Sequence, residues 1–189
     1  MGLRDSYSPG TFCWIHLNTT DADDARSYYG DLFGWSFVDP ETGSMDGRAV
    51  AGLRGMGADE GTAPYWLSFV AVDNADTTTQ KAEGLGARIL AAPFDVGSSG
   101  RMSVMQDPVG AVFAAWQPGD EIGAQRVNQH GTLCWNELIT TDAQVAGTFY
   151  STLFGWSLEP FGDSYTVFMN GERPAGGLLT PDAAADPVS

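Results

Sequence analysis

Residues 10–22 read GTFCWIHLNTTDA, and residues 131–143 read GTLCWNELITTDA. The match continues in a second shared string, YGDLFGWS at residues 29–36 and YSTLFGWS at residues 150–157. Across residues 10–37, at an offset of 121, 16 of 28 positions are identical, which chance does not produce. The chain therefore contains a duplicated unit, and this unit decides the fold.

Each copy of the unit predicts the same order of elements. In the first copy an apolar strand covers residues 12–17, and Thr20-Asp21 provides a turn and a helix N-cap. A helix with apolar residues at helical spacing follows, and Gly34 ends it. A strand over residues 35–38 and further short strands over residues 46–55 complete a β-α-β-β-β module.

The whole chain divides into three such modules. A diverged copy starts with a strand over residues 66–72, followed by a helix and three strands. The expected organisation is module one at residues 10–58, module two at 64–118, a linker at 119–130, module three at 131–180 and a tail at 181–189. This predicts an α+β protein with one complete domain, residues 10–118, and the first half of a second.

The third module raises a question about what completes it. By the repeat, a fourth module would start one position beyond Ser189, so either the chain is truncated or a second polypeptide completes the sheet. A half-domain alone exposes a sheet edge and an apolar face. We therefore expect module three to pair with a partner, in a homodimer or with a second chain, or to be poorly packed.

Composition narrows the class of protein. The 189 residues are 43% apolar and 17% charged, which suffices for real cores and argues against disorder. A net charge of −15 repels nucleic acid and anionic membrane surfaces. No apolar run is long enough to span a membrane or serve as a signal peptide, so a cytoplasmic protein is expected. Cys13 and Cys134 stand at equivalent points of two separate units, which disfavours a disulfide.

Tandem modules with these motifs resemble the vicinal oxygen chelate superfamily of glyoxalases, bleomycin-resistance proteins and extradiol dioxygenases. The most specific strings are YGDLFGW at residues 29–35, YSTLFGW at 150–156 and QDPVGAVF at 106–113. The doubled start looks like a two-domain actinobacterial subgroup often labelled hydroxylase or glyoxalase-like. The resemblance implies that two modules join their sheets into a cup that holds the ligand, with the helices outside. Such a fold hosts many chemistries and does not by itself settle function.

The metal site of that superfamily is not expected here. The resemblance implies His or Glu ligands on the first strand of each module and a Glu on a last strand. These positions fall at Trp14, at Leu67 (or Trp66 if the register slips by one) and at Ala114, with Trp135 in module three. None of these side chains coordinates such a metal ion. We therefore expect no metal and no other cofactor.

The cup is expected to be lined by aromatic side chains. Strand alternation places Trp14, His16 and Asn18 on one face, which must be the cup. The apolar set Cys13, Ile15 and Leu17 then faces the helix. The other predicted ligand-binding residues are Phe69 (with Trp66 as the alternative), Met105, Trp116, Trp135 and Glu137. Trp35 and Trp156, just after the helix ends, are assigned to packing.

His16 and Glu137 are the polar candidates in this set. A lone histidine in a cup either bonds to ligand or water or acts as a general base, and an unperturbed pKa near 6.5 permits the second role. A metal site at His16 would need further ligands, and His130 in the linker is the only other histidine. Glu137 has a raised pKa if it faces an apolar cavity, and is simply solvated if the second cup is incomplete.

Three functional hypotheses follow. The first is a metal-independent protein that binds a planar hydrophobic molecule, an aromatic natural product or xenobiotic, in the cup of the first domain. The second is a metal-free enzyme of secondary metabolism, an isomerase, cyclase or oxygenase-type protein that uses His16 as acid or base. The third is a partner-dependent remnant without activity. All three exclude nucleic acid and membranes as partners.

Overall fold

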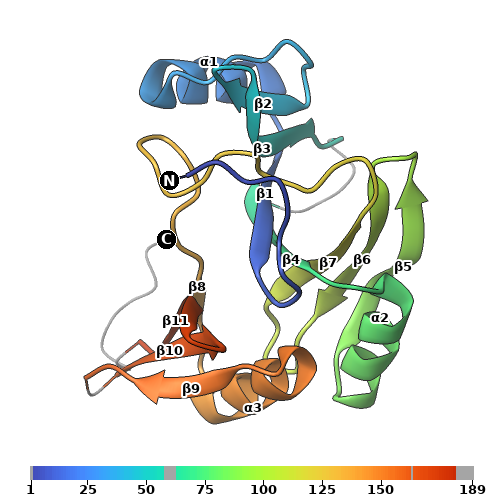
Figure 1. The fold of residues 1–189 in the computed structure, drawn as a ribbon, viewed down its shortest axis with the longest axis vertical. Helices are drawn as coiled ribbons and strands as arrows, with labels where there is room; N and C mark the ends of the chain where they lie inside the picture. The colour runs from blue at the N-terminus through green and yellow to red at the C-terminus, as the bar shows by residue number, and fades with distance from the viewer. Residues whose placement is uncertain (1, 58–62, 163, 182–189) are drawn as a thin grey trace.

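The computed structural model describes residues 2–57, 63–162 and 164–181 and shows an α+β protein with two sheets (Figure 1). The larger sheet has seven strands in the order β2-β3-β1-β4-β7-β6-β5. Its strands are β1 (Phe12–Thr19), β2 (Thr42–Met45), β3 (Arg48–Gly55), β4 (Tyr65–Ala71), β5 (Arg88–Val96), β6 (Gly100–Gln106) and β7 (Val112–Pro118). β1 and β4 pair antiparallel at the centre, so the first strands of modules one and two join the two modules.

The smaller sheet belongs to module three alone. It has the order β8-β11-β10-β9, with β8 (Glu137–Ile139), β9 (Ser157–Pro160), β10 (Tyr165–Asn170) and β11 (Arg173–Leu179). β8 pairs in parallel with β11, as β1 pairs in parallel with β3. Module three therefore repeats the internal topology of module one.

In the part of the chain that the structure describes, three helices cover the outer faces of the sheets, and their ends follow the predicted capping signals. They are α1 (Ala22–Phe33), α2 (Ala75–Gly84) and α3 (Ala143–Phe154). Asp21 and Asp142 accept N-terminal backbone N–H groups in α1 and α3, and Gly34 and Gly155 end these helices with φ angles of 73° and 75°. Glycine adopts this left-handed conformation without a steric cost, which is why both copies end their helix there.

One predicted strand of module one is wrong. Residues 35–38 form only an isolated bridge between Ser36 and Ser44, whereas the equivalent residues of module three form β9. The Asp39 carboxylate accepts hydrogen bonds from the Glu41 N–H and the Thr42 hydroxyl. This local turn bends the chain directly after the bridge and ends the pairing.

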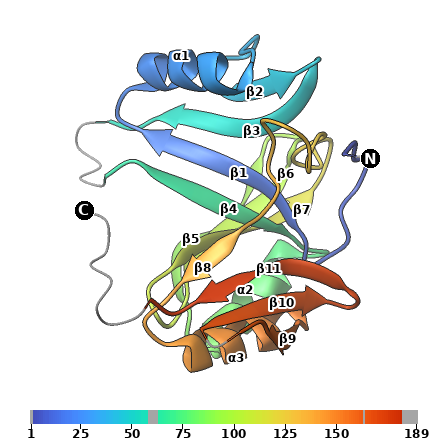
Figure 2. The same ribbon diagram turned by 90° about the vertical axis from the view of Figure 1, so that its left-hand side faces the viewer.

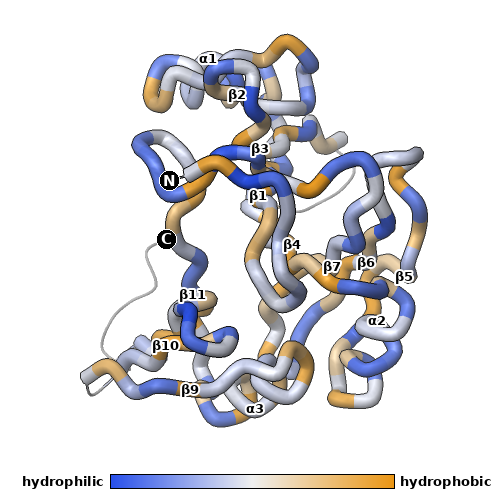
Figure 3. Tube along the Cα trace, in the orientation of Figure 1, coloured by the Kyte–Doolittle hydropathy of each residue, from blue (hydrophilic) through white to orange (hydrophobic). Residues whose placement is uncertain are grey.

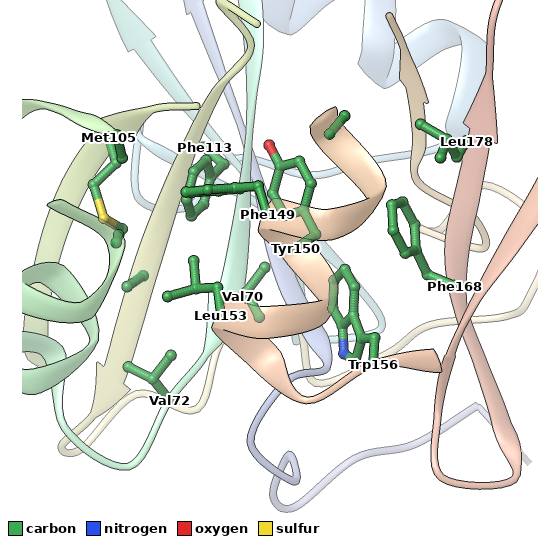
Figure 4. Packing of buried hydrophobic residues seen from close by; sticks show 14 of the residues in the cluster. Val70, Val72, Met105, Phe113, Phe149, Tyr150, Leu153, Trp156, Phe168 and Leu178 are labelled. Atoms are coloured by element: carbon green, nitrogen blue, oxygen red, sulfur yellow. The ribbon is translucent and has the colours of Figure 1, made fainter. Parts of the chain in front are cut away.

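The main core joins module two to module three (Figure 4). Phe149, Tyr150 and Leu153 of α3 lie between the helix-side face of module two, represented by Phe113, and the sheet of module three, represented by Phe168. Module three is therefore not poorly packed, and its helix is held by a continuous hydrophobic core. α1 and α3 lie at opposite ends of the molecule, as both ribbon views show (Figures 1 and 2).

A bulge corrects the predicted facing of the first strand. The pairing of β1 with β4 shifts register between Phe12 and Trp14. Cys13 consequently packs in a buried cluster with Phe69 and Trp116 rather than against α1, while Phe12 contacts Trp156. Ile15 and Leu17, beyond the bulge, face the α1 side as predicted.

Hydrophobic and hydrophilic residues alternate along the trace instead of gathering in one long segment (Figure 3). Within the described residues, no helix combines the length and apolarity needed to cross a membrane. Cys13 and Cys134 are both free thiols, as the repeat predicts.

Candidate functional site

The larger sheet encloses a cavity of about 600 Å³ on the face opposite its helices. Four strands supply its rings and apolar side chains: Trp14 and His16 from β1, Phe69 from β4, Met102 from β6 and Trp116 from β7. Asp39, Glu41 and Glu121 lie at its rim on loops. The cavity is thus a cup with flat apolar walls and an acidic rim.

The rings at the base of the cup are fixed by one another and by their neighbours. His16 stacks on Phe69 with centroids 6.4 Å apart, and Trp116 meets Phe69 edge-on at the same distance. The Trp116 Nε1 donates to the Glu121 carbonyl oxygen at 2.9 Å, so this indole is anchored away from solvent. Aromatic pairs at these separations favour such offset and edge-on geometries.

Two glycines provide the space for these rings. A Cβ atom added at Gly52 of β3 would lie 2.6 Å from the His16 Nδ1, and one added at Gly100 would lie 2.6 Å from the Trp116 ring. Gly52 is the direct neighbour of His16 in the parallel pair of β1 and β3. The imidazole therefore lies flat across a position where no side chain fits.

His16 is electrically neutral at physiological pH. Burial, with a smaller contribution from the Arg54 guanidinium, lowers the pKa of His16 to about 4. Its Nε2 is buried and has no hydrogen-bond partner among the residues that the structure describes. A neutral ring with one unused polar atom is suited to bonding a ligand, and it is a weak proton acceptor at pH 7.

Asn18 belongs to the predicted face but not to the cavity lining. It lies buried near the end of β1, where its Oδ1 accepts a hydrogen bond from the Arg54 Nε at 3.3 Å. This contact positions Asn18 at the side of the sheet and leaves Trp14 and His16 as the β1 residues of the cup.

Met105 does not line the cup, contrary to the prediction from the sequence. Its side chain is fully buried in the helix-side core with Phe113, and Met102 takes the expected place in the cup. The two methionines are three residues apart on β6, so they point to opposite faces. The strand register, not the residue type, decides which of them lines the cavity.

Trp135 and Glu137, the module three equivalents of Trp14 and His16, lie outside this cup. The Trp135 Nε1 donates to the Tyr165 hydroxyl at 2.9 Å. Desolvation, followed by a hydrogen bond to Glu137, raises the pKa of that hydroxyl. Trp135 borders a separate polar cavity of about 780 Å³ that also contains Arg4 and Arg173. The structure thus gathers Trp14, His16, Phe69 and Trp116 in the cup and leaves Trp135 and Glu137 outside it.

The residues at the expected metal position do not fit a metal ion. Trp14, Leu67 and Ala114 lie together in one apolar cluster at the base of the cup. No group of three His, Cys, Asp or Glu side chains that could hold a metal ion occurs within residues 2–57, 63–162 and 164–181. Hydrocarbon side chains supply no ligand atoms, so the base of the cup differs in its chemistry from the metal site of the superfamily.

Sequence reasoning missed Gly52, Met102 and the three rim carboxylates. Pairing of the first and third strands of a module would have placed Gly52 beside His16. The rim carboxylates lie on loops, whose paths carry no periodic signal.

The fold and the sequence agree on the relatives of this chain. It is 37% identical over 196 residues to CFP32 of Mycobacterium tuberculosis, provisionally named a glyoxylase, covering 96% of this chain and 75% of that protein. It is 33% identical over 170 residues to the anthracycline biosynthesis protein DnrV of Streptomyces peucetius, covering 79% of this chain and 62% of that one. The chain therefore spans three quarters or less of the length of these relatives.

Solved structures share the fold at low sequence identity. The Mn(II)-bound glyoxalase from Novosphingobium aromaticivorans matches with a TM-score of 0.67 and 14% identity, over 92% of this chain and 62% of that chain. The 2,2',3-trihydroxybiphenyl 1,2-dioxygenase from Sphingomonas wittichii matches with a TM-score of 0.63 and 13% identity, over 95% and 70% of the two chains. Residues 11–114 match a family model, and with the β-α-β-β-β modules and the relatives this shows that the chain belongs to the Glyoxalase/Bleomycin resistance protein/Dioxygenase superfamily.

Proposed function

We propose that the cup binds a planar hydrophobic small molecule, an aromatic natural product or xenobiotic, without a metal ion. The observation that carries this proposal is the cavity of about 600 Å³ walled by Trp14, Phe69 and Trp116. Its volume lies within the range of small-molecule sites, and flat rings favour a flat ligand through stacking and apolar burial. Metal independence rests on the apolar side chains at the family's ligand positions.

The polar groups of the cup suit orientation of the ligand. The buried Nε2 of neutral His16 offers one hydrogen-bond position beside Phe69. A hydroxyl or carbonyl group on the ligand would satisfy that atom, whose burial without a partner costs about 1–3 kcal/mol. One such contact in an apolar cup fixes which edge of a flat molecule points inward.

The relatives favour the same ligand class. DnrV of Streptomyces peucetius is named an anthracycline biosynthesis protein, and anthracyclines contain a planar fused-ring system. This chain shares 33% of aligned residues with it over 79% of its own length. We therefore place planar polycyclic quinones first among the candidate ligands.

A titration with dihydroxyanthraquinone, a planar tricyclic probe, tests the proposal. We expect saturable quenching of tryptophan fluorescence at micromolar concentrations, equal with and without a chelator. Trp14→Ala should weaken binding about five- to tenfold, because a stacked ring contributes about 1–1.5 kcal/mol. Trp135→Ala is the matched control and should bind as the wild type does. Absence of saturable binding, or binding that the chelator abolishes, contradicts the proposal.

The alternative is a metal-free enzyme in which His16 transfers a proton. Its support is that His16 lines the cavity, and the lowered pKa of about 4 weighs against a base that works at neutral pH. Product analysis after incubation with the bound quinone separates the two functions. Turnover that His16→Gln abolishes, while binding persists, would establish the enzyme and replace the binding protein.

A further inference from the structure

The cavity of about 780 Å³ beside module three differs from the cup in the charge of its lining. The described lining of the cup contains the three rim carboxylates and no lysine or arginine. The lining of the larger cavity contains two arginines, Arg4 and Arg173, and one carboxylate, Glu172, among the residues that the structure describes. The two cavities share no lining residue. The larger one, here called the arginine cavity, is therefore a separate space with an excess of positive charge.

The arginines of this cavity have no ion pair, although the chain is rich in acidic residues. It contains 24 Asp and Glu residues against nine Lys and Arg residues. Arg26, Arg101 and Arg126 each form an ion pair with an aspartate. Arg4 and Arg173 form none with any carboxylate in the described part of the chain. No internal salt bridge therefore neutralises the two guanidinium groups that line this cavity.

The side chain of Arg4 also has an unused hydrogen-bond donor. Its Nε is buried and has no hydrogen-bond partner within residues 2–57, 63–162 and 164–181. A buried polar group without a partner is costly, and more so when it is charged. The planar guanidinium presents its donors in a fixed fork that matches a carboxylate or a phosphate group. An oxyanion in the cavity that Arg4 lines would supply acceptors of this kind.

The backbone holds both arginines in place. The first residues of the chain lie beside the linker (Figure 1), and the Arg4 N–H donates to the Gln125 carbonyl oxygen at 3.0 Å. Arg173 begins β11 and pairs with Asn170 of β10. Binding of an anion therefore orders side chains on a backbone that is already fixed, which lowers the entropic cost.

Neutral polar groups form much of the remaining wall. They are the hydroxyls of Ser6 and Thr11 and the amides of Asn128, Asn136 and Asn170. Asn136 and Asn170 each use one side-chain polar atom in a hydrogen bond within the protein, which leaves the other for a ligand. The volume lies within the range of small-molecule sites. This wall suits a hydroxylated molecule better than the flat apolar one that the cup suits.

We propose that the arginine cavity binds a small hydroxylated molecule that carries a carboxylate or phosphate group. Arg4 and Arg173 bind the oxyanion, and the hydroxyl and amide groups of the wall bind the rest of the molecule. The proposal is independent of what the cup binds, because the two cavities have no residue in common.

The thiol of Cys134 provides a reporter for the test. Cys134 is exposed in the wall of the cavity, whereas Cys13 is fully buried, so a small reagent reaches Cys134 first. The measurement is the rate of Cys134 alkylation by iodoacetamide, a neutral reagent, at constant ionic strength. Glycerol 3-phosphate and glycerate carry the two candidate groups on a three-carbon framework, and glycerol is the matched neutral control.

We expect at least one of the two anions to slow the alkylation saturably at millimolar concentrations, and glycerol to have no effect. The anion that protects at the lower concentration identifies the preferred group. Arg4→Gln and Arg173→Gln should each raise the concentration for half-protection about five- to tenfold, because each removes a charge-assisted contact. Arg88→Gln, at an exposed arginine on β5, is the matched control and should behave as the wild type does. Arg173 is exposed, so its variant decides the test if Arg4→Gln lowers the melting temperature.

Three results would overturn the proposal. The first is that neither anion protects Cys134. The second is that glycerol protects as well as the anions do, which would leave no role for the charge. The third is protection that persists unchanged in Arg173→Gln, which would place the anion away from the arginine cavity.

Discussion

In module one the repeated first strand lies inside a sheet, whereas in module three it lies at an edge among the residues that the structure describes. β1 runs for eight residues between two partners, and β8 forms only three residues of strand beside β11. The two segments share the residues Gly-Thr-x-Cys-Trp-x-x-Leu, so local propensity does not explain the difference. Strand length here depends on the number of neighbouring strands, which is a tertiary effect.

Modules one and three also differ in the side chain that lies over an equivalent glycine. Gly52 of β3 makes room for the His16 ring, and Gly177 of β11 makes room for the Tyr165 hydroxyl. In module one the occupant is a buried neutral imidazole, and in module three it is a phenol bonded to Trp135. The same backbone position therefore lies beside a buried imidazole in one half and beside a partly exposed phenol in the other.

The largest difference in stability loss should appear between equivalent substitutions in α3 and α1. Phe149→Ala should lower the free energy of unfolding by about 3–4 kcal/mol, because it opens a cavity in the main core. Tyr28→Ala, at the equivalent position of α1, should cost about 0.5 kcal/mol or less. Urea unfolding measures the free energy of unfolding of both variants. Equal costs would show that the α1 face is already covered in solution.

The next largest effect is a dependence of stability on pH that arises from His16 in module one. The pKa of His16 is about 4 in the folded chain and near 6.5 in an unfolded one, so below pH 6.5 the unfolded state binds the extra proton. Stability from this group is full above pH 6.5, falls by about 3 kcal/mol as pH drops to 4, and changes no further below that.

His16→Gln should remove that part of the acid dependence, as followed by urea unfolding at pH 7, 5.5 and 4. His130→Gln, at an exposed linker residue, should retain it. An acid profile that is the same in both variants would show that His16 titrates normally.

A smaller effect should separate the two glycines. Gly52→Ala should cost about 2 kcal/mol and weaken quinone binding, because its Cβ displaces a packed imidazole. Gly177→Ala should cost about 1 kcal/mol, since its Cβ meets the hydroxyl and Cζ of Tyr165, a partly exposed ring that can turn away once its bond from the Trp135 Nε1 breaks. Thermal melting and the quinone titration measure both. A larger loss at Gly177 than at Gly52 would mean that the Tyr165 ring cannot turn away.

The smallest effect should be equal in both halves. The Trp35 Nε1 donates to the Gly131 carbonyl oxygen at 2.7 Å, and the Trp156 Nε1 donates to the Gly10 carbonyl oxygen, its repeat equivalent, at 2.9 Å. Trp35→Phe and Trp156→Phe each remove one of these equivalent hydrogen bonds, which is worth about 1 kcal/mol. We expect similar losses in urea unfolding for the two variants, and an additive loss in the double variant. A cost at only one tryptophan would show that the two equivalent hydrogen bonds do not contribute equally to stability.

The repeat predicted more of the fold than of the site. The helix caps at Asp21 and Gly34 and the cup-facing positions Trp14 and His16 are local signals that survive folding. The bulge at Cys13 was not predictable, because it depends on the pairing of β1 with a strand over fifty residues away. The wrong prediction of Met105 in place of Met102 has the same origin, since the register of β6 decides which of its side chains face the cup.

The packing of α3 on module two left no pattern in the sequence. Phe149 and Tyr28 stand at equivalent helix positions and are both aromatic, yet one is buried and the other exposed. An amphipathic pattern shows that a helix has an apolar face, but it does not say which body covers that face.

Lys81 is the single lysine of the chain, and its amine lies at the junction of α2 and α3. A protease that cleaves after lysine therefore has one peptide bond to attack, and that bond lies within a helix. The protein carries a built-in reporter: cleavage into two fragments proceeds only as fast as α2 unfolds or separates from module three.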